Sequence, residues 1–122
     1  MRGGAQPVIK VYLLPAEWGE EELERCFYAL LAGAQTVASL RVQTEDDFIV
    51  VFPKDAMLKG LGTEILIEVD VPAPWAPTYD AEDEIASMTF EVMRRLLPGA
   101  HIQCKVYKFE TSHGFCVSGL DD

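Results

Sequence analysis

The sequence predicts an α+β fold with the element order β-α-β-β-α-β, built from two similar β-α-β halves. Apolar, β-branched segments of strand length alternate with segments that carry apolar residues at helical spacing. A Pro-Ala-x-Trp motif follows the first and the third expected strands, at positions 57 residues apart. The length of 122 residues suits one domain. We therefore expect a single domain over 1–122, with halves at about 7–53 and 63–109 and a tail at 110–122.

The first half is expected to contain a strand, a helix and a second strand. Residues 8–14 are almost continuously apolar and lie between two prolines, which is typical of a central strand. Residues 20–32 begin with three glutamates, which the helix dipole favours in a first turn, and carry one apolar stripe. Residues 34–40 either extend this helix or form a second short one. Residues 48–52, Phe-Ile-Val-Val-Phe, are the second expected strand.

The second half repeats this order. Residues 64–71 alternate apolar with mainly acidic side chains, which predicts a strand whose acidic side faces solvent or an interface. The proline-rich segment 72–77 follows, and Asp80 is the expected N-cap of the second helix. This helix is expected to stop at Pro98 and the glycine after it. Residues 102–109 alternate apolar and polar side chains and form the fourth expected strand.

The composition disfavours several kinds of partner. The formal net charge is −10. A chain this acidic is repelled by nucleic acid and by anionic membranes, so we expect neither as a partner. No apolar run approaches the roughly 20 residues that span a bilayer. The first residues lack the apolar stretch of a signal peptide, and we expect a cytoplasmic protein.

The cysteines and histidines suggest no metal centre. Cys26, Cys104 and Cys116 are odd in number and contain no CxxC pair, so a disulfide framework is not expected. With His101 and His113 they do not offer the ligand spacing of tetrahedral zinc. No glycine-rich phosphate loop is present either. We expect neither a metal nor a cofactor.

Several features together resemble a known family. Pro7 stands directly before the strand segment 8–12, an acid-led helix follows, and a second β-α-β half of similar size comes next. The tail segment 109–115 is similar to that of small tautomerase-like bacterial proteins. In these features the chain resembles the tautomerase superfamily, which includes 4-oxalocrotonate tautomerase and macrophage migration inhibitory factor. The resemblance implies the tautomerase fold, a small organic acid as ligand or substrate, and a closed homo-oligomer, first of all a trimer.

The resemblance also implies a catalytic site. Superfamily members use an amino-terminal proline as general base, because a free secondary amine in apolar surroundings accepts a proton at neutral pH. An arginine orients the substrate carboxylate. Pro7 and Arg41 are the corresponding candidates. Six residues precede Pro7, so its nitrogen is an amide, and Pro7 can act as a base only if the chain is processed to begin there. Otherwise Pro7 marks a strand boundary and Arg41 is a solvated loop arginine.

Trp18 and Trp75 stand at corresponding strand-to-helix junctions of the two halves. Their large apolar rings, each with one polar N–H, are suited to line a pocket for an apolar or aromatic ligand. The alternative is that they cap the core or pack in a subunit interface. We include both tryptophans with Arg41 as candidate binding residues.

Element order leaves a second fold open, the ferredoxin-like fold, in which the halves interleave into one antiparallel sheet. Parallel pairing of 8–14 with 48–52 would indicate the tautomerase fold. Antiparallel pairing of 8–14 with 64–71 at the sheet centre would indicate the ferredoxin-like fold. In that case the alternative function is a non-catalytic ligand-binding or protein-interaction module.

Overall fold

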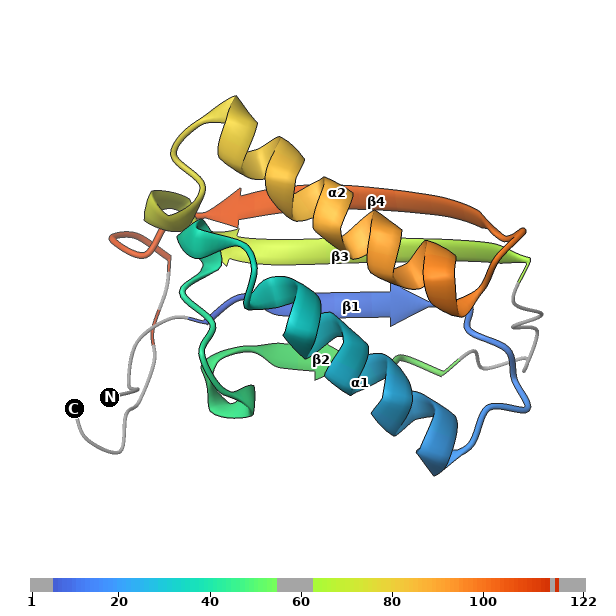
Figure 1. The fold of residues 1–122 in the computed structure, drawn as a ribbon. Helices are drawn as coiled ribbons and strands as arrows, with labels where there is room; N and C mark the ends of the chain where they lie inside the picture. The colour runs from blue at the N-terminus through green and yellow to red at the C-terminus, as the bar shows by residue number, and fades with distance from the viewer. Residues whose placement is uncertain (1–5, 55–62, 115, 117–122) are drawn as a thin grey trace.

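The computed structural model describes residues 6–54, 63–114 and 116, and these residues form one mixed four-stranded sheet with two longer helices (Figure 1). The strands are β1 (Val8–Tyr12), β2 (Ile49–Val51), β3 (Glu64–Pro72) and β4 (His101–Phe109). The helices are α1 (Glu20–Ala34) and α2 (Tyr79–Leu96), with short 3-10 turns η1 (Ala38–Leu40), η2 (Glu45–Asp47) and η3 (Ala73–Trp75). The α+β order β-α-β-β-α-β that the sequence predicts is confirmed.

The direction of strand pairing decides between the two folds. The strand order is β2-β1-β3-β4, and β1 pairs with β2 in parallel, as β3 does with β4. Each half therefore closes its own parallel pair, which is the tautomerase layout and excludes the interleaved ferredoxin-like one. The antiparallel pairing of β1 with β3 is also present at the sheet centre. The expectation that this antiparallel pairing would indicate the ferredoxin-like fold was wrong, because both folds join their halves through an antiparallel pair of the first and third strands.

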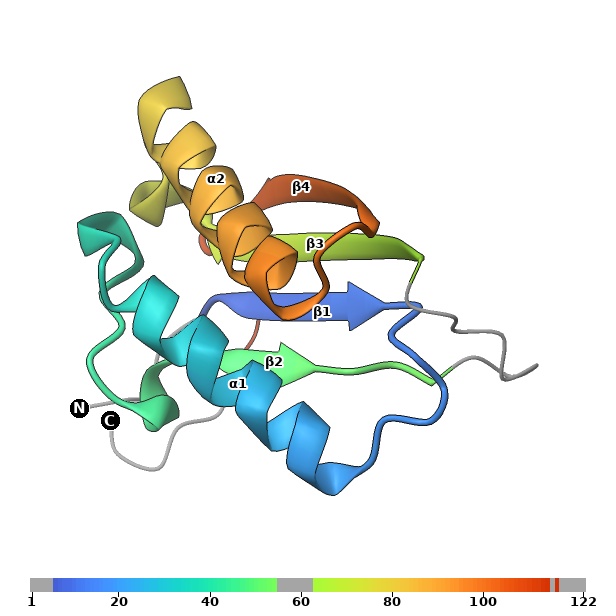
Figure 2. The same ribbon diagram turned by 45° about the vertical axis from the view of Figure 1, so that its right-hand side comes forward.

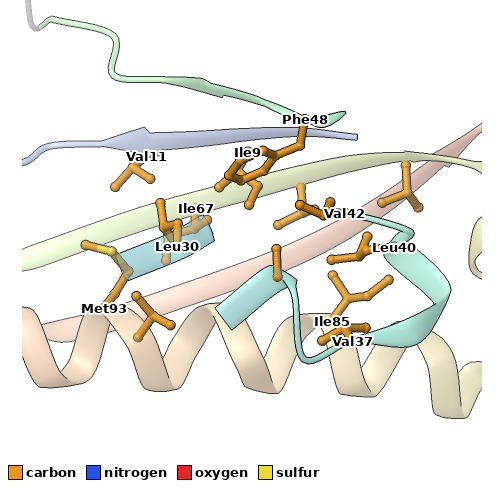
Figure 3. Close-up of a cluster of buried hydrophobic side chains, with 14 of the residues drawn as sticks. Ile9, Val11, Leu30, Val37, Leu40, Val42, Phe48, Ile67, Ile85 and Met93 are labelled. Atoms are coloured by element: carbon orange, nitrogen blue, oxygen red, sulfur yellow. The ribbon is translucent and has the colours of Figure 1, made fainter. Parts of the chain in front are cut away.

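Both helices cover the same face of the sheet (Figure 2). Alternate residues of β1 and β3, such as Ile9, Val11 and Ile67, point towards the helices and are at most 1% exposed. They meet Leu30 of α1 and Met93 of α2, both fully buried (Figure 3). The strands supply side chains with period two and the helices with period 3.6, so one apolar layer forms between them.

The two helices approach each other closely at Gly33. A Cβ atom at this position would lie 2.8 Å from both Met88 Sδ and Val92 Cγ2 of α2. An alanine here would force the Met88 or Val92 side chain to shift. Gly33 therefore lies within α1 and sets its spacing from α2, and the helix ends one residue later, at Ala34.

Several boundaries differ from the predicted ones. Helix α2 begins at Tyr79, and Thr78 is its N-cap, with its hydroxyl oxygen accepting a hydrogen bond from the Ala81 backbone N–H at 3.1 Å. The prediction that Asp80 caps this helix was therefore wrong, and Asp80 lies in the first turn instead. The segment 34–40 resolves into the last residue of α1 followed by η1. Of the tail predicted at 110–122, residues 115 and 117–122 lie outside the described residues.

Among the described residues, no helix covers the second face of the sheet. Lys10 Nζ lies 3.1 Å from Asp70 Oδ2 on this face. The exposed apolar residues Ile49, Val51 and Tyr107 lie on the same face, because they stand opposite Val8, Lys10 and Asp70 in the strand registers. The predicted solvent- or interface-facing side of the third strand is this face.

Candidate functional site

Arg41 occupies an unusual backbone position directly after η1. Its φ and ψ angles are 58° and 32°, in the left-handed region. This region is sterically costly for residues other than glycine. The neighbours Leu40 and Val42 are 1% and 5% exposed, so buried side chains fix the chain on either side of the turn (Figure 3). Arg41 itself is exposed.

The Arg41 guanidinium lies over the Trp75 ring, with its central carbon 5.6 Å from the ring centroid. Strand β3 runs antiparallel to β1, so η3 at its carboxyl end lies at the same end of the sheet as the start of β1 (Figure 1). Helix α1 carries the chain back to this end, where η1 meets η3. The structure thus brings together two of the candidate residues, Arg41 and Trp75.

Arg41 has no carboxylate partner in the part of the chain that the structure describes. The ion pairs found there join Lys10 to Asp70, Arg94 to Glu91 and Lys108 to Glu82. No acidic side chain among these described residues pairs with the Arg41 guanidinium, which can therefore donate hydrogen bonds to an anion from outside.

Pro7 lies at this same end of the sheet, immediately before β1. It is buried, and its carbonyl oxygen accepts a hydrogen bond from the Ile49 N–H at 3.0 Å. The Gln6 side-chain amide donates to the Asp46 carbonyl oxygen at 2.6 Å. The Gln6–Pro7 peptide is thus held at the edge of the β1–β2 pair, and in this chain the Pro7 nitrogen is an amide without a basic lone pair.

Trp18 lies at the opposite end of the sheet. It follows the carboxyl end of β1, where its backbone N–H donates to the Pro15 carbonyl oxygen at 3.0 Å, and its side chain packs partly buried against the core. The two tryptophans occupy equivalent junctions, but the antiparallel arrangement of the halves sends these junctions to opposite ends. Within one chain Trp18 does not share a site with Arg41 and Trp75.

The short link between α2 and β4 also contains a left-handed residue. After α2 the left-handed position belongs to Gly99, with φ at 90° and no heavy atom within 4 Å of the point that a Cβ atom would occupy. Glycine adopts such angles without a steric penalty. Arg41 thus adopts a backbone region that glycine adopts more easily.

Ser39, two residues before Arg41, is a second feature of the same turn that is unfavourable for stability. Its hydroxyl oxygen is buried and has no hydrogen-bond partner among the described residues. Unpaired buried hydroxyls are uncommon in folded proteins. Nothing in the sequence marks Ser39, because neither its burial nor its missing partner depends on local pattern.

Two grooves beside α2 lie away from Arg41. A groove of 540 Å³ runs between α1 and α2 beside Gly33 and Met88. A second groove, of 400 Å³, is lined by residues of α2 and by Cys104 of β4. Burial raises the pKa of the Cys104 thiol to about 11 and that of Cys26 to about 12. Both thiols stay protonated at neutral pH, which does not suit a nucleophile.

Residues 6–54, 63–114 and 116 contain no group of three or more His, Cys, Asp or Glu side chains that could hold a metal ion. In the same part of the chain, no helix is both long and apolar enough to cross a membrane.

No protein-family model matches the sequence, and no curated protein matches it significantly. Solved structures do match. N1, a member of the cis-3-chloroacrylic acid dehalogenase family, aligns with a TM-score of 0.65 at 12% identity, over 93% of this chain and 85% of that chain. A macrophage migration inhibitory factor-like protein from Entamoeba histolytica gives 0.61 at 11% identity, over 93% and 98%. A fused 4-OT symmetric trimer gives 0.65 at 11% identity, over 93% and 94%.

These three structures come from the tautomerase superfamily. The match extends over both β-α-β halves. Because only 11% or 12% of the residues are identical, it shows a shared fold and nothing more. The resemblance that the sequence indicates is confirmed at this level, and the chain has the tautomerase fold.

Proposed function

We propose that this protein binds a small organic acid through the Arg41 guanidinium, at the end of the sheet where Arg41 lies over Trp75. The observation that carries the proposal is an arginine that lies over an indole ring, 5.6 Å from its centroid, without a carboxylate partner among the described residues. A guanidinium in this arrangement offers its N–H fork to a carboxylate in two parallel hydrogen bonds. The chloroacrylic acid in the name of one structural relative is a molecule of this class.

For a chain in which Gln6 precedes Pro7, the proposed activity is binding and not proline-dependent isomerisation. Pro7 lies at the same end of the sheet, but its nitrogen forms the peptide bond with Gln6. Base catalysis by Pro7 requires a chain that begins at this residue. A free proline amine in this buried position would lose solvation in its charged form, which lowers its pKa towards neutrality.

The binding proposal is tested with benzoate and its uncharged analogue benzamide. We expect benzoate, and not benzamide, to shift the Arg41 and Trp75 side-chain signals in NMR spectra. Arg41→Gln should weaken benzoate binding roughly tenfold or more, because it removes charge-assisted hydrogen bonds. Arg25→Gln makes the same change of charge on the exposed face of α1 and should retain the affinity. Equal affinities in both variants would contradict the proposal.

The role of Pro7 has a separate test. A shortened chain that begins at Pro7 should gain keto–enol isomerase activity on an arylpyruvate relative to the full chain. Replacing Pro7 by Ala in the shortened chain should remove most of that gain. Background rates in both the full and the shortened chain would exclude Pro7 as a base for this substrate.

We also propose that the chain forms a homo-oligomer, in the first instance a trimer, through the uncovered face of the sheet. Ile49, Val51 and Tyr107 are 43%, 40% and 45% exposed there. Acidic residues crowd the first turns of α1 and α2, so the helical side repels a second copy. On the sheet face, Lys10 is paired with Asp70 and repulsion is smaller. One structural relative, the fused 4-OT protein, is named as a symmetric trimer, which agrees with this assembly.

Light scattering behind a sizing column tests the assembly. Wild-type protein should have the mass of three chains, and the double variant Ile49→Asp, Val51→Asp should have the mass of one. Tyr79→Asp adds one negative charge at a residue that is 82% exposed in α2 and should leave the mass unchanged. A monomeric wild type would contradict the proposal.

We further propose the cytoplasm as the location, because free thiols such as Cys26 and Cys104 persist in a reducing compartment.

A further inference from the structure

We infer that Trp75 and the left-handed backbone of Arg41 are positioning features, which hold the Arg41 guanidinium in its binding orientation before an anion arrives. The inference rests on the proposed function and gives Trp75 a role different from lining the ligand. In this arrangement Trp75 acts through Arg41 and not by touching the acid.

The first support is the fixed position of both partners. Arg41 stands between the buried side chains of Leu40 and Val42 (Figure 3). Trp75 stands in η3, directly before the fully buried Ala76. Side chains placed on such anchored turns keep their relative geometry better than side chains on free loops.

The second support is the entropy of an arginine side chain. A free arginine loses considerable rotamer freedom when it is immobilised. The contact with the Trp75 ring, 5.6 Å from the guanidinium carbon to the ring centroid, restricts the Arg41 side chain before an anion binds. The acid then binds a group that is already ordered, which raises affinity without any new contact.

The third support is the backbone of Arg41. The left-handed angles are unfavourable for arginine, whereas glycine, as at Gly99, adopts this region without a steric penalty. Ser39 leaves a buried hydroxyl without a partner among the described residues in the same turn. Unfavourable backbone and polar features that persist together are typical of functional sites, where they are retained at the expense of stability.

The backbone part is tested by comparing glycine with alanine at two arginines. Both Arg41→Gly and Arg41→Ala remove the stacked cation, so their difference reports the backbone alone. We expect Arg41→Gly to unfold at a higher denaturant concentration than Arg41→Ala. At Arg25, in the regular helix α1, the order should be reversed, because glycine weakens a helix interior. The same order at both sites, with alanine the more stable, would contradict the strained-turn part of the inference.

The Trp75 part is tested by NMR and by benzoate titration of the full chain. In the wild type the indole ring current should displace the Arg41 side-chain proton signals. Trp75→Phe should keep part of this displacement and most of the affinity, since an aromatic face remains. Trp75→Leu should lose the displacement and bind benzoate roughly three- to tenfold more weakly. Unchanged affinity in Trp75→Leu would overturn the positioning role.

The two proposals fail in different ways. A wild-type protein that binds no benzoate contradicts the proposed function. A wild type that binds benzoate through Arg41 while Trp75→Leu binds it equally well supports the proposed function and contradicts only the positioning role.

Discussion

Cys26 Sγ of α1 lies 3.7 Å from Met93 Sδ of α2, and both residues are completely buried. This contact joins the two halves of the chain at the centre of the helical layer. The thiol is enclosed by apolar neighbours, and burial raises its pKa to about 12. Its role is therefore that of a small apolar side chain with a weak donor.

The three cysteines should react at very different rates. Thiol reagents attack the thiolate, and burial holds the pKa of Cys26 at about 12 and that of Cys104 at about 11. Cys116 is exposed. At pH 8, iodoacetamide should label Cys116 rapidly and the other two only after denaturation, as counted by mass spectrometry. Rapid labelling of Cys26 in the native protein would contradict the packing of α1 against α2.

Stability should decrease in alkaline solution because of Cys26. The folded pKa of about 12 is above the ordinary thiol value of 9.0, so the native state retains the thiol proton to higher pH than the unfolded state. This contribution is complete below pH 9 and is lost as the pH rises towards 12. Cys26→Val keeps an apolar side chain of similar size and should show a smaller loss of unfolding free energy between pH 9 and 11. Identical pH slopes would count against the buried thiol.

Gly33→Ala should destabilise the protein. The added Cβ would lie 2.8 Å from Met88 Sδ and from Val92 Cγ2, and the branched Val92 side chain cannot easily move aside. Overpacking of this kind costs about 1–3 kcal/mol, against a gain of about 1 kcal/mol from better helix propensity. We expect a net loss of about 1 kcal/mol in urea unfolding. Adding Val92→Ala should restore part of it, and a stabilised single variant would refute the close approach of the helices.

Ser39→Ala should stabilise the protein. The Ser39 hydroxyl oxygen is buried without a partner among the described residues, and its removal relieves a desolvation cost of about 1–3 kcal/mol. Thr89 is the matched contrast, because its buried hydroxyl donates to the Ile85 carbonyl oxygen at 2.9 Å. Thr89→Val should therefore lower the unfolding temperature while Ser39→Ala raises it. A loss of stability in Ser39→Ala would indicate that its hydroxyl has a partner in solution.

Local pattern was sufficient for the elements of the fold. The apolar alternation of β1 and β3 and the 3.6-residue stripe through Cys26 and Leu30 determined which side chains are buried. The N-cap of α2 was missed, because Thr78 and Asp80 are both good capping residues and only the backbone distinguishes them. The choice between the two folds was also beyond local pattern, since hydrogen bonds between distant strands decide it.

The sequence by itself determined the two-half organisation, the apolar layer and the separate candidacies of Pro7, Arg41, Trp18 and Trp75. These follow from the spacing of neighbouring residues and from a resemblance in layout. Only the tertiary structure showed that Arg41 lies over Trp75 and that Trp18 lies at the opposite end of the sheet. The antiparallel pairing of β1 with β3 determines which strand-to-helix junctions lie close together. The left-handed turn at Arg41 was likewise decided by the buried residues on either side of it, since an isolated arginine favours other backbone angles.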